Sequence, residues 1–412
     1  CALFFFSNNN KEKIFTSFKT LQESFAKNVL LESEEDNVKQ QSGAGTLKLT
    51  INPLLASGDQ QTSALIENLN NTTFAYDFQL DEEARKMLFN FSMGPNQLEQ
   101  LNLQYYQEQE NGYLLLKNIY DKYLVLENTD IFSYLDEGTT DEDLTYLKDI
   151  VVNSLKKEIK EEDIKSEKAK LDEKETTKLS LEEDKDKFAT YIDTILKDLE
   201  ADEKTKEILG ENLTELKTLK DDIKDSEKFK FIYAIYLDQN KTIKYEVSIE
   251  DEATDLDISY YDQDEKIIEV KSFDEVVIKG TIEKNNDTVT IHLTDEENDY
   301  GTISLSSKKI EMDLSYLDET NTLTEITFLA LEEDNKINVT AAINMSIGQD
   351  SLEILKLEAN GNISEQVNFE DINLDNQIPI TSLTEEEQEK ILTQIMTIFL
   401  PYMGLNNGNL TF

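Results

Sequence analysis

The sequence predicts an α+β fold: large, curved antiparallel β-meander sheets, half-barrel-like, with amphipathic helices on one face and a central helical insert. Apolar and polar residues alternate in short runs from Lys228 to about Gly348. A period of two indicates strands with one buried face. Polar turns, such as 238–241, end the runs. Helical periodicity appears before, between and after the strand regions, which predicts an α+β class.

Composition supports a folded chain and excludes some partners. The 412 residues include 17 Tyr and 19 Phe, more aromatic residues than disordered chains carry. The net charge of -46 repels phosphate backbones, so we expect no nucleic-acid binding. We interpret the acidity as an aid to solubility rather than as a cation site. Arg85 is the only arginine among 40 basic residues, which removes bidentate guanidinium clamps from the plausible mechanisms.

The first six residues, Cys1–Phe6, form an apolar block that a polar stretch follows. Two interpretations, both of an exported protein, stay open. Either the block is the outer end of a transmembrane helix, or Cys1 is the lipid-modified first residue of a mature lipoprotein. A third interpretation is that it is only a fragment edge. The first two predict an extracytoplasmic protein anchored to the cytoplasmic membrane through its N-terminus.

The first elements are a helix and a meander. Ile14, Phe18, Leu21, Phe25 and Val29 recur at helical spacing and predict an amphipathic helix over Lys11–Val29. The next predicted elements are a strand at Thr46–Leu54, a short helix at Ser63–Leu69, and strands at Thr73–Asp77, Lys86–Phe91, Leu101–Tyr106, Gly112–Leu116 and Tyr123–Leu126.

The middle of the chain is helical and highly charged. Thr140 and the acidic residues after it predict a helix start, followed by an apolar stripe of Leu144, Leu147, Ile150, Val151 and Leu155. Lys156–Glu173 is ambiguous. The following predictions are a strand at Thr176–Leu181 and helices at Asp184–Leu199, Glu203–Leu209 and Glu211–Ile223.

A second meander and a closing helix follow. The meander opens with the alternating run after Lys228. Its later strands are predicted at Leu256–Tyr260, Ile267–Ser272, Val276–Lys284, Thr288–Thr294, Gly301–Ser306, Ile310–Tyr316, Thr324–Leu331, Lys336–Ser346 and Ser351–Glu358. Ser382 is the predicted N-cap of a helix that buries Ile391, Ile395, Ile398 and Phe399 and ends at Pro401.

These elements divide the chain into segments. They are a membrane-anchor or lipid-anchor stub (1–10), a helix with the first meander (11–139), the helical insert (140–227), the second meander (228–381) and the C-terminal helix and tail (382–412). Whether the two meanders form one sheet or two stays open at this point.

The sequence signals no reaction centre. His292, the only histidine, alternates with Ile291 and Leu293, which predicts a solvent-facing strand residue rather than part of a triad. One histidine and Cys1 exclude an ordinary zinc site. The run from Asp255 resembles the start of a calcium loop, but Tyr260 stands where that loop needs glycine. We therefore assign no catalytic, cofactor-binding or metal-binding residue and expect no cofactor.

The plan resembles uncharacterised membrane-anchored extracytoplasmic (lipo)proteins of low-GC Gram-positive bacteria and, more distantly, the lipoprotein-carrier half-barrels typified by LolA and LppX. The resemblance covers most of the chain as a pattern: the helix at Lys11–Val29, consecutive hairpins, and helices able to cover a concave face. It includes no specific motif. It implies a curved sheet covered by helices, sometimes with an apolar cavity. The insert at Thr140–Ile223 departs from the small carriers.

We expect a non-catalytic, membrane-tethered extracytoplasmic protein that binds an apolar ligand, such as a lipid, or an envelope protein on its sheet. The alternatives are a structural or adhesive interaction protein of the cell surface and, more remotely, a carboxylate-based hydrolase. A competing interpretation is that sheet faces and helices only bury one another. The deciding observation is whether the apolar sheet face is filled by the chain's own helices.

Overall fold

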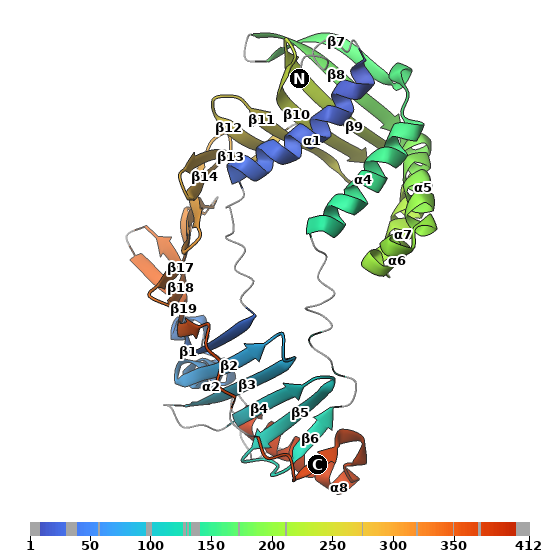
Figure 1. Cartoon of the computed structure of the whole chain (residues 1–412). Helices are drawn as coiled ribbons and strands as arrows, with labels where there is room; N and C mark the ends of the chain where they lie inside the picture. Colours follow the sequence, from blue (N-terminus) through green and yellow to red (C-terminus); the bar gives the residue numbers. More distant parts are fainter. Residues whose placement is uncertain are drawn as a thin grey trace. The chain divides into compact units, whose positions relative to one another are not determined.

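The computed structural model shows a sheet-rich α+β chain that divides into two compact units (Figure 1). Unit 1 comprises Cys1–Glu32 and Glu137–Thr302, and unit 2 comprises Ser33–Asp136 and Ile303–Phe412. The structure describes residues 9–29, 39–56, 58–95, 101–126, 129, 132, 141–171, 174–210, 212–273, 275–318, 320–348, 350–369 and 372–400. The predictions for Cys1–Phe6, Thr140 and Pro401 concern residues outside these ranges.

The sheet of unit 1 is an antiparallel meander in which each strand pairs with its neighbours in sequence. Its strands are β7 (Ile164–Leu171), β8 (Lys174–Asp184), β9 (Phe229–Asp238), β10 (Lys241–Asp251), β11 (Asp255–Asp262), β12 (Lys266–Ser272), β13 (Glu275–Asn285) and β14 (Thr288–Thr294). The chain then passes from unit 1 into unit 2 within β15 (Asp299–Ser306).

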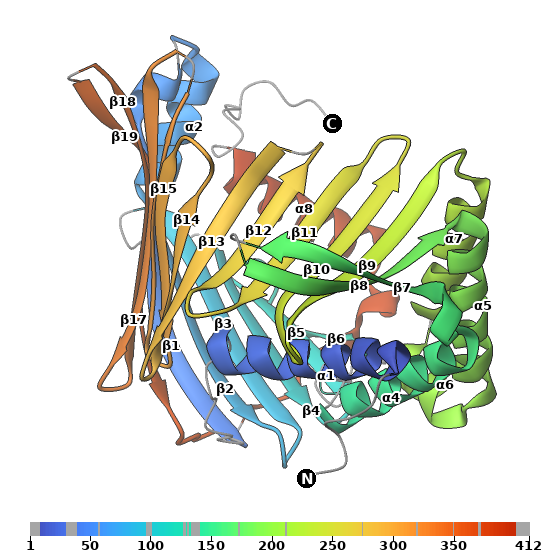
Figure 2. The same cartoon turned by 90° about the horizontal axis from the view of Figure 1, so that it is seen from above.

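Helix α1 (Asn10–Val29) lies across one face of this sheet (Figures 1 and 2). Ile14 is fully buried in the main core of the unit. The ring of Phe18 stacks on Tyr233 of β9, with ring centroids 4.4 Å apart, and Phe25 meets Tyr260 of β11 edge-on at 6.1 Å. The sheet face of unit 1 is therefore occupied by the chain's own helix.

The start of α1 is fixed by a distant carboxylate. Glu161, in the short 3-10 turn η2 (Glu161–Asp163), accepts hydrogen bonds from the backbone N–H groups of Asn10 and Lys11 at 2.8 and 2.9 Å. A carboxylate at this position satisfies free N–H groups and interacts favourably with the helix dipole.

The helical insert of unit 1 packs against the sheet, because Val152 and Tyr191 belong to the same core as Ile14. Its helices are α4 (Asp141–Glu158), α5 (Lys185–Ala201), α6 (Glu203–Leu209) and α7 (Asn212–Asp225). Asp184 caps α5 and Asp202 caps α6, because their carboxylates accept from backbone N–H groups one turn later. Leu196, Leu199 and Leu213 form their shared core. The predicted stripe of α4 is wrong at Leu144, which is 55% exposed in the first turn of the helix.

The sheet of unit 2 joins both meanders. Its strand order is β20-β6-β5-β4-β3-β2-β1-β19-β18-β17-β16, antiparallel except for the β20–β6 pair. The strands are β1 (Gln40–Ile51), β2 (Thr72–Asp81), β3 (Lys86–Pro95), β4 (Leu101–Glu108), β5 (Asn111–Lys117), β6 (Tyr123–Leu126), β16 (Lys309–Leu317), β17 (Thr322–Glu333), β18 (Lys336–Ile347), β19 (Asp350–Ser364) and β20 (Gln377–Pro379).

Strand β1 starts six residues earlier than predicted, at Gln40, and a 3-10 turn, η1 (Pro53–Ala56), replaces its predicted end. The alternation did not predict the strand start at Gln40 because Gly43 and Gly45 follow it, and glycine is depleted in strands. The structure compensates for Gly45 with an aromatic side chain. A Cβ atom there would lie 2.8 Å from the hydroxyl of Tyr76 and 2.4 Å from the carbonyl oxygen of Asn360.

Two helices border the sheet of unit 2. Helix α8 (Glu385–Phe399) buries the predicted residue Ile391 against a core formed by β3–β6. Its N-cap is Thr384 rather than the predicted Ser382, because Thr384 and Glu387 form a reciprocal capping box while Ser382 ends the 3-10 turn η3 (Ile380–Ser382). Helix α2 (Gln60–Asn70) follows β1, and the side-chain amide of Asn70 pairs with both backbone groups of Ile51.

Candidate functional site

The two faces of the unit 2 sheet differ in chemistry. One register row crosses eight neighbouring strands with apolar residues only, and we call its side of the sheet the apolar face. The row consists of Leu101, Met93, Phe74, Leu47, Ala359, Val339, Ala330 and Ile310. Because side chains alternate along a strand, the neighbouring residues form the opposite, polar face.

Burial changes along the apolar face. At the β3 and β4 end, Met93 and Leu101 are 5% and 7% exposed in the core that α8 closes, whereas Ile310 of β16 is 43% exposed. Within the described part of the chain, none of the hydrophobic cores includes a residue of β16–β19. We call the exposed end of the apolar face the apolar strip. It consists of Ile310, Tyr316, Ile326, Met345 and Ile347.

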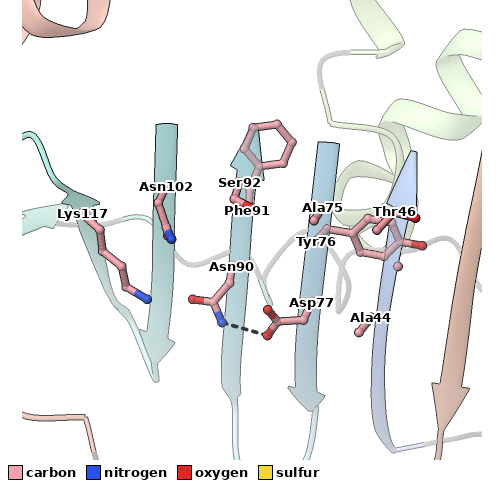
Figure 3. A pocket seen from close by; sticks show the side chains of 11 residues that line it. Ala44, Thr46, Ala75, Tyr76, Asp77, Asn90, Phe91, Ser92, Asn102 and Lys117 are labelled. Atoms are coloured by element: carbon pink, nitrogen blue, oxygen red, sulfur yellow. Dashed lines mark hydrogen bonds between the residues drawn. The ribbon is translucent and has the colours of Figure 1, made fainter. Parts of the chain in front are cut away.

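The polar face carries a shallow depression of about 550 Å³ across β1–β5, which we call the polar groove (Figure 3). The small residues of its lining are Ala44, Gly45, Thr46, Ala75 and Ser92. Polar and charged side chains surround them. These include Asp77, Asn90, Asn102 and Lys117.

A directional chain of hydrogen bonds ends at two residues that line the polar groove, Asn90 and Asp77. The Tyr123 hydroxyl donates to Gln104 Oε1 at 2.6 Å, Gln104 Nε2 donates to Asn90 Oδ1 at 2.8 Å, and Asn90 Nδ2 donates to Asp77 Oδ1 at 2.8 Å. A carboxylate only accepts hydrogen bonds, so Asp77 sets the orientation of both amides. The Asn90 amide is therefore pre-oriented in the groove for a ligand that offers both a donor and an acceptor.

A second depression, of about 750 Å³, adjoins helix α8 and shares Lys117 with the polar groove. We call it the helix-side depression. Its lining includes the ammonium groups of Lys122 and Lys390 and the amide of Gln394. The Gln394 Oε1 atom is buried and accepts no hydrogen bond from the described residues. Three lysines, Lys117, Lys122 and Lys390, thus share this depression with the carboxylates of Asp121 and Glu387.

Glu387 joins helix α8 to the loop beyond β5. Its carboxylate accepts from Thr384 N at 3.0 Å and from the Tyr120 hydroxyl at 2.9 Å, and Lys122 lies 3.6 Å away. The Thr384 backbone N–H, followed by the Tyr120 hydroxyl, lowers the pKa of Glu387 to about 2. This group therefore stays ionised at neutral pH and acts as a structural link.

In the described part of unit 1, the buried carboxylate of Glu183 and the partly buried carboxylate of Glu246 already have hydrogen-bond partners. Glu183 accepts from the Tyr191 hydroxyl, and burial raises the pKa of Glu183 above its usual value. Burial alone would also raise the pKa of Glu246, but the ammonium groups of Lys244 and Lys178 hold it below its usual value. Both carboxylates therefore bind side chains within unit 1 and have a structural role.

His292, Asp255 and Arg85, to which the sequence drew attention, are not among the residues that line these surfaces. His292 is partly exposed on β14, with Nε2 3.4 Å from Asp299 Oδ1, as the strand alternation predicted. Asp255 starts a regular strand, β11, which agrees with the strand interpretation of that run. Cys1 lies outside the described residues. Arg85 lies in the turn after β2, with its guanidinium over the ring of Phe132 at 5.5 Å.

The hydrogen-bond chain that ends at the polar groove was not identified from the sequence. Asp77, Asn90 and Gln104 look like ordinary polar strand residues, and only the pairing of three strands brings them together. A partial signal existed, because the hairpin turn after Asp81 fixes the register that places Asp77 opposite Asn90.

Metal-binding groups and membrane-spanning helices are both absent from the described ranges. These ranges hold no group of three or more His, Cys, Asp or Glu side chains placed to bind a metal ion. None of the helices in them combines the length and apolar character that crossing a membrane requires.

Comparison with known proteins found little. No protein-family model matches the sequence, and no curated protein matches it. Among solved structures, the chain is similar to the translocator domain of autotransporter NalP from Neisseria meningitidis, with 6% sequence identity and a TM-score of 0.14. That match covers 87% of this chain and 99% of the other.

Proposed function

We propose that this chain is a non-catalytic binding protein, tethered outside the cytoplasmic membrane, whose apolar strip holds an apolar ligand such as a lipid acyl chain. The observation that supports it is the burial gradient along the apolar face of unit 2. α8 covers one end of that face, and the strip on β16–β18 lies exposed at the other. Several exposed large apolar side chains on one sheet face typically mark an interaction site.

The shape of the strip favours a long, flexible ligand. Strands β16–β18 have 9, 12 and 12 residues and therefore extend roughly 30–40 Å. Apart from the Tyr316 hydroxyl, the side chains of the strip offer dispersion contacts but no hydrogen bonds, which suits a hydrocarbon chain. The face of unit 1 is a poorer candidate because α1 already fills it.

The tether is the apolar N-terminal block discussed above, either as part of a membrane helix or through a lipid on Cys1. A tethered protein of this kind works next to a supply of lipid. The alternative, a structural or adhesive role in the envelope, would place a protein partner on the same strip.

Native mass spectrometry after mild purification tests the proposal, together with lipid-dependent thermal shifts. We expect retained lipid and a stabilising shift, both lost in Ile326→Glu. The matched control is Thr327→Glu, because Thr327 lies next to Ile326 but on the opposite face. No retained lipid and no thermal shift in the wild type would reject the apolar-ligand function. A purified envelope protein that binds the wild type but not Ile326→Glu would favour the alternative.

A further inference from the structure

The polar groove has opposite charges toward its two ends. Asp77 lies on β2 and Lys117 on β5, three strand spacings apart, which corresponds to roughly 15 Å along the diagonal. Figure 3 shows the Lys117 side chain reaching from β5 toward the centre of the groove. Among the ion pairs of the described residues, neither Asp77 nor Lys117 has a partner.

The side chains between these charges suit a peptide backbone. Ala75 and Ser92 have short side chains, so a ligand backbone can approach the sheet closely. The oriented amide of Asn90 offers both a donor and an acceptor, as peptide groups require. Preoriented groups lose little entropy when a ligand binds.

Further positive charge lies near the lysine end of the groove. The helix-side depression begins at Lys117 and also contains Lys122 and Lys390 together with the carboxylates of Asp121 and Glu387, so its three ammonium groups outnumber its two carboxylates. An anionic end of a ligand is therefore better placed here than elsewhere on a chain with a net charge of -46.

We propose that the polar groove binds an extended peptide of about five residues, with its amino end at Asp77 and its carboxylate end at Lys117. An extended chain advances about 3.3 Å per residue, so this length matches the separation of the two charges. The direction follows from charge complementarity. The site lies on the polar face and is independent of the apolar strip.

NMR titration with a synthetic pentapeptide of alanine and serine tests this assignment. We expect weak, saturable binding for the peptide with free termini. Acetylating its amino end should weaken binding about threefold, the size typical of an exposed ion pair. Asp77→Asn should weaken the free peptide equally and leave the acetylated peptide unchanged. Amidating the carboxylate of the peptide should also weaken binding about threefold. Lys117→Gln should weaken binding of the unamidated peptide equally and leave binding of the amidated peptide unchanged.

The controls separate a specific site from general electrostatics. Lys309→Gln removes a charge of the same sign from the polar face of β16, outside the groove, and should leave binding unchanged. Asp77→Asn keeps the acceptor for Asn90, so circular dichroism should show an unaltered fold. Absence of saturable binding, equal affinity for doubly blocked peptides, or tighter binding of maltopentaose that neither variant alters would overturn the proposal.

Discussion

The hydroxyl groups of Ser17 and Tyr233 lie 2.8 Å apart in the interior of unit 1, although 216 residues separate them in the sequence. Ser17 donates its own proton to the carbonyl oxygen of Ile14 at 2.6 Å, so the Tyr233 hydroxyl is the donor to Ser17. Burial raises the pKa of Tyr233, which keeps that donor protonated. This contact holds α1 on the sheet and so closes the face that could have held a ligand.

Removing either partner should destabilise unit 1 through the same bond. Tyr233→Phe and Ser17→Ala should each lower the free energy of unfolding by about 1 kcal/mol. The double variant should lose clearly less than the sum, because only one bond is shared. Urea unfolding of the four proteins measures this, and simple additivity would show that the contact contributes nothing to stability.

The buried Glu183 should make unit 1 less stable as the pH rises. Its folded-state pKa lies above the ordinary 4.5, because burial disfavours the carboxylate. The folded state therefore binds more protons, and its advantage is complete below pH 4.5 and is lost as the pH rises through the raised pKa. Glu183→Gln still accepts from Tyr191 and should be more stable than the wild type at pH 7.

Urea unfolding between pH 4 and 8 compares the two proteins. The exposed Glu162→Gln serves as a control for charge alone. Curves for the wild type and Glu183→Gln that run parallel across this range would contradict the assignment.

The capping carboxylate Glu387 should give the opposite pH dependence at helix α8. Its pKa is lowered to about 2, chiefly by the Thr384 backbone N–H and the Tyr120 hydroxyl. The stabilisation is therefore present above pH 4.5 and is lost as the pH falls toward 2. The protection factors of the α8 amides, which correct for the fall of intrinsic exchange with pH, should decrease over this range in the wild type. Glu387→Gln should show lower protection factors at pH 7 and no such decrease, whereas Glu386→Gln, altered one residue earlier, should follow the wild type.

The glycine at position 45 should not tolerate a side chain. Gly45→Ala should destabilise unit 2 by about 2 kcal/mol, because the added Cβ would lie 2.4 Å from a backbone oxygen that cannot rotate away. Thr46→Ala, on the adjacent residue, should change stability by less than about 0.5 kcal/mol. Thermal unfolding distinguishes them, and equal effects would mean that β1 and β19 separate easily at this point.

Local elements were largely predictable from the sequence, whereas long-range pairing was not. Alternation located most strands, and apolar periodicity identified the buried face of α8 through Ile391. Nothing local indicates that β1 pairs with β19, or that β20 runs parallel to β6. The polar groove depends on such pairing. The hairpin turn fixes Asp77 opposite Asn90, but the partner of Asn90 on β4 follows a connection without a tight-turn signal.

The double pairing of β1 has a consequence for synthesis of the chain. One edge of β1 meets β2 almost at once, but Ser42 donates to Gln366, which emerges from the ribosome 324 residues later. During that interval the second edge is a free template for other nascent strands. The glycines that make β1 a weak strand former also make it a poor partner for such strands. The same glycines thus make β1 hard to predict from the sequence and keep its pairing with wrong strands weak until β19 has been translated.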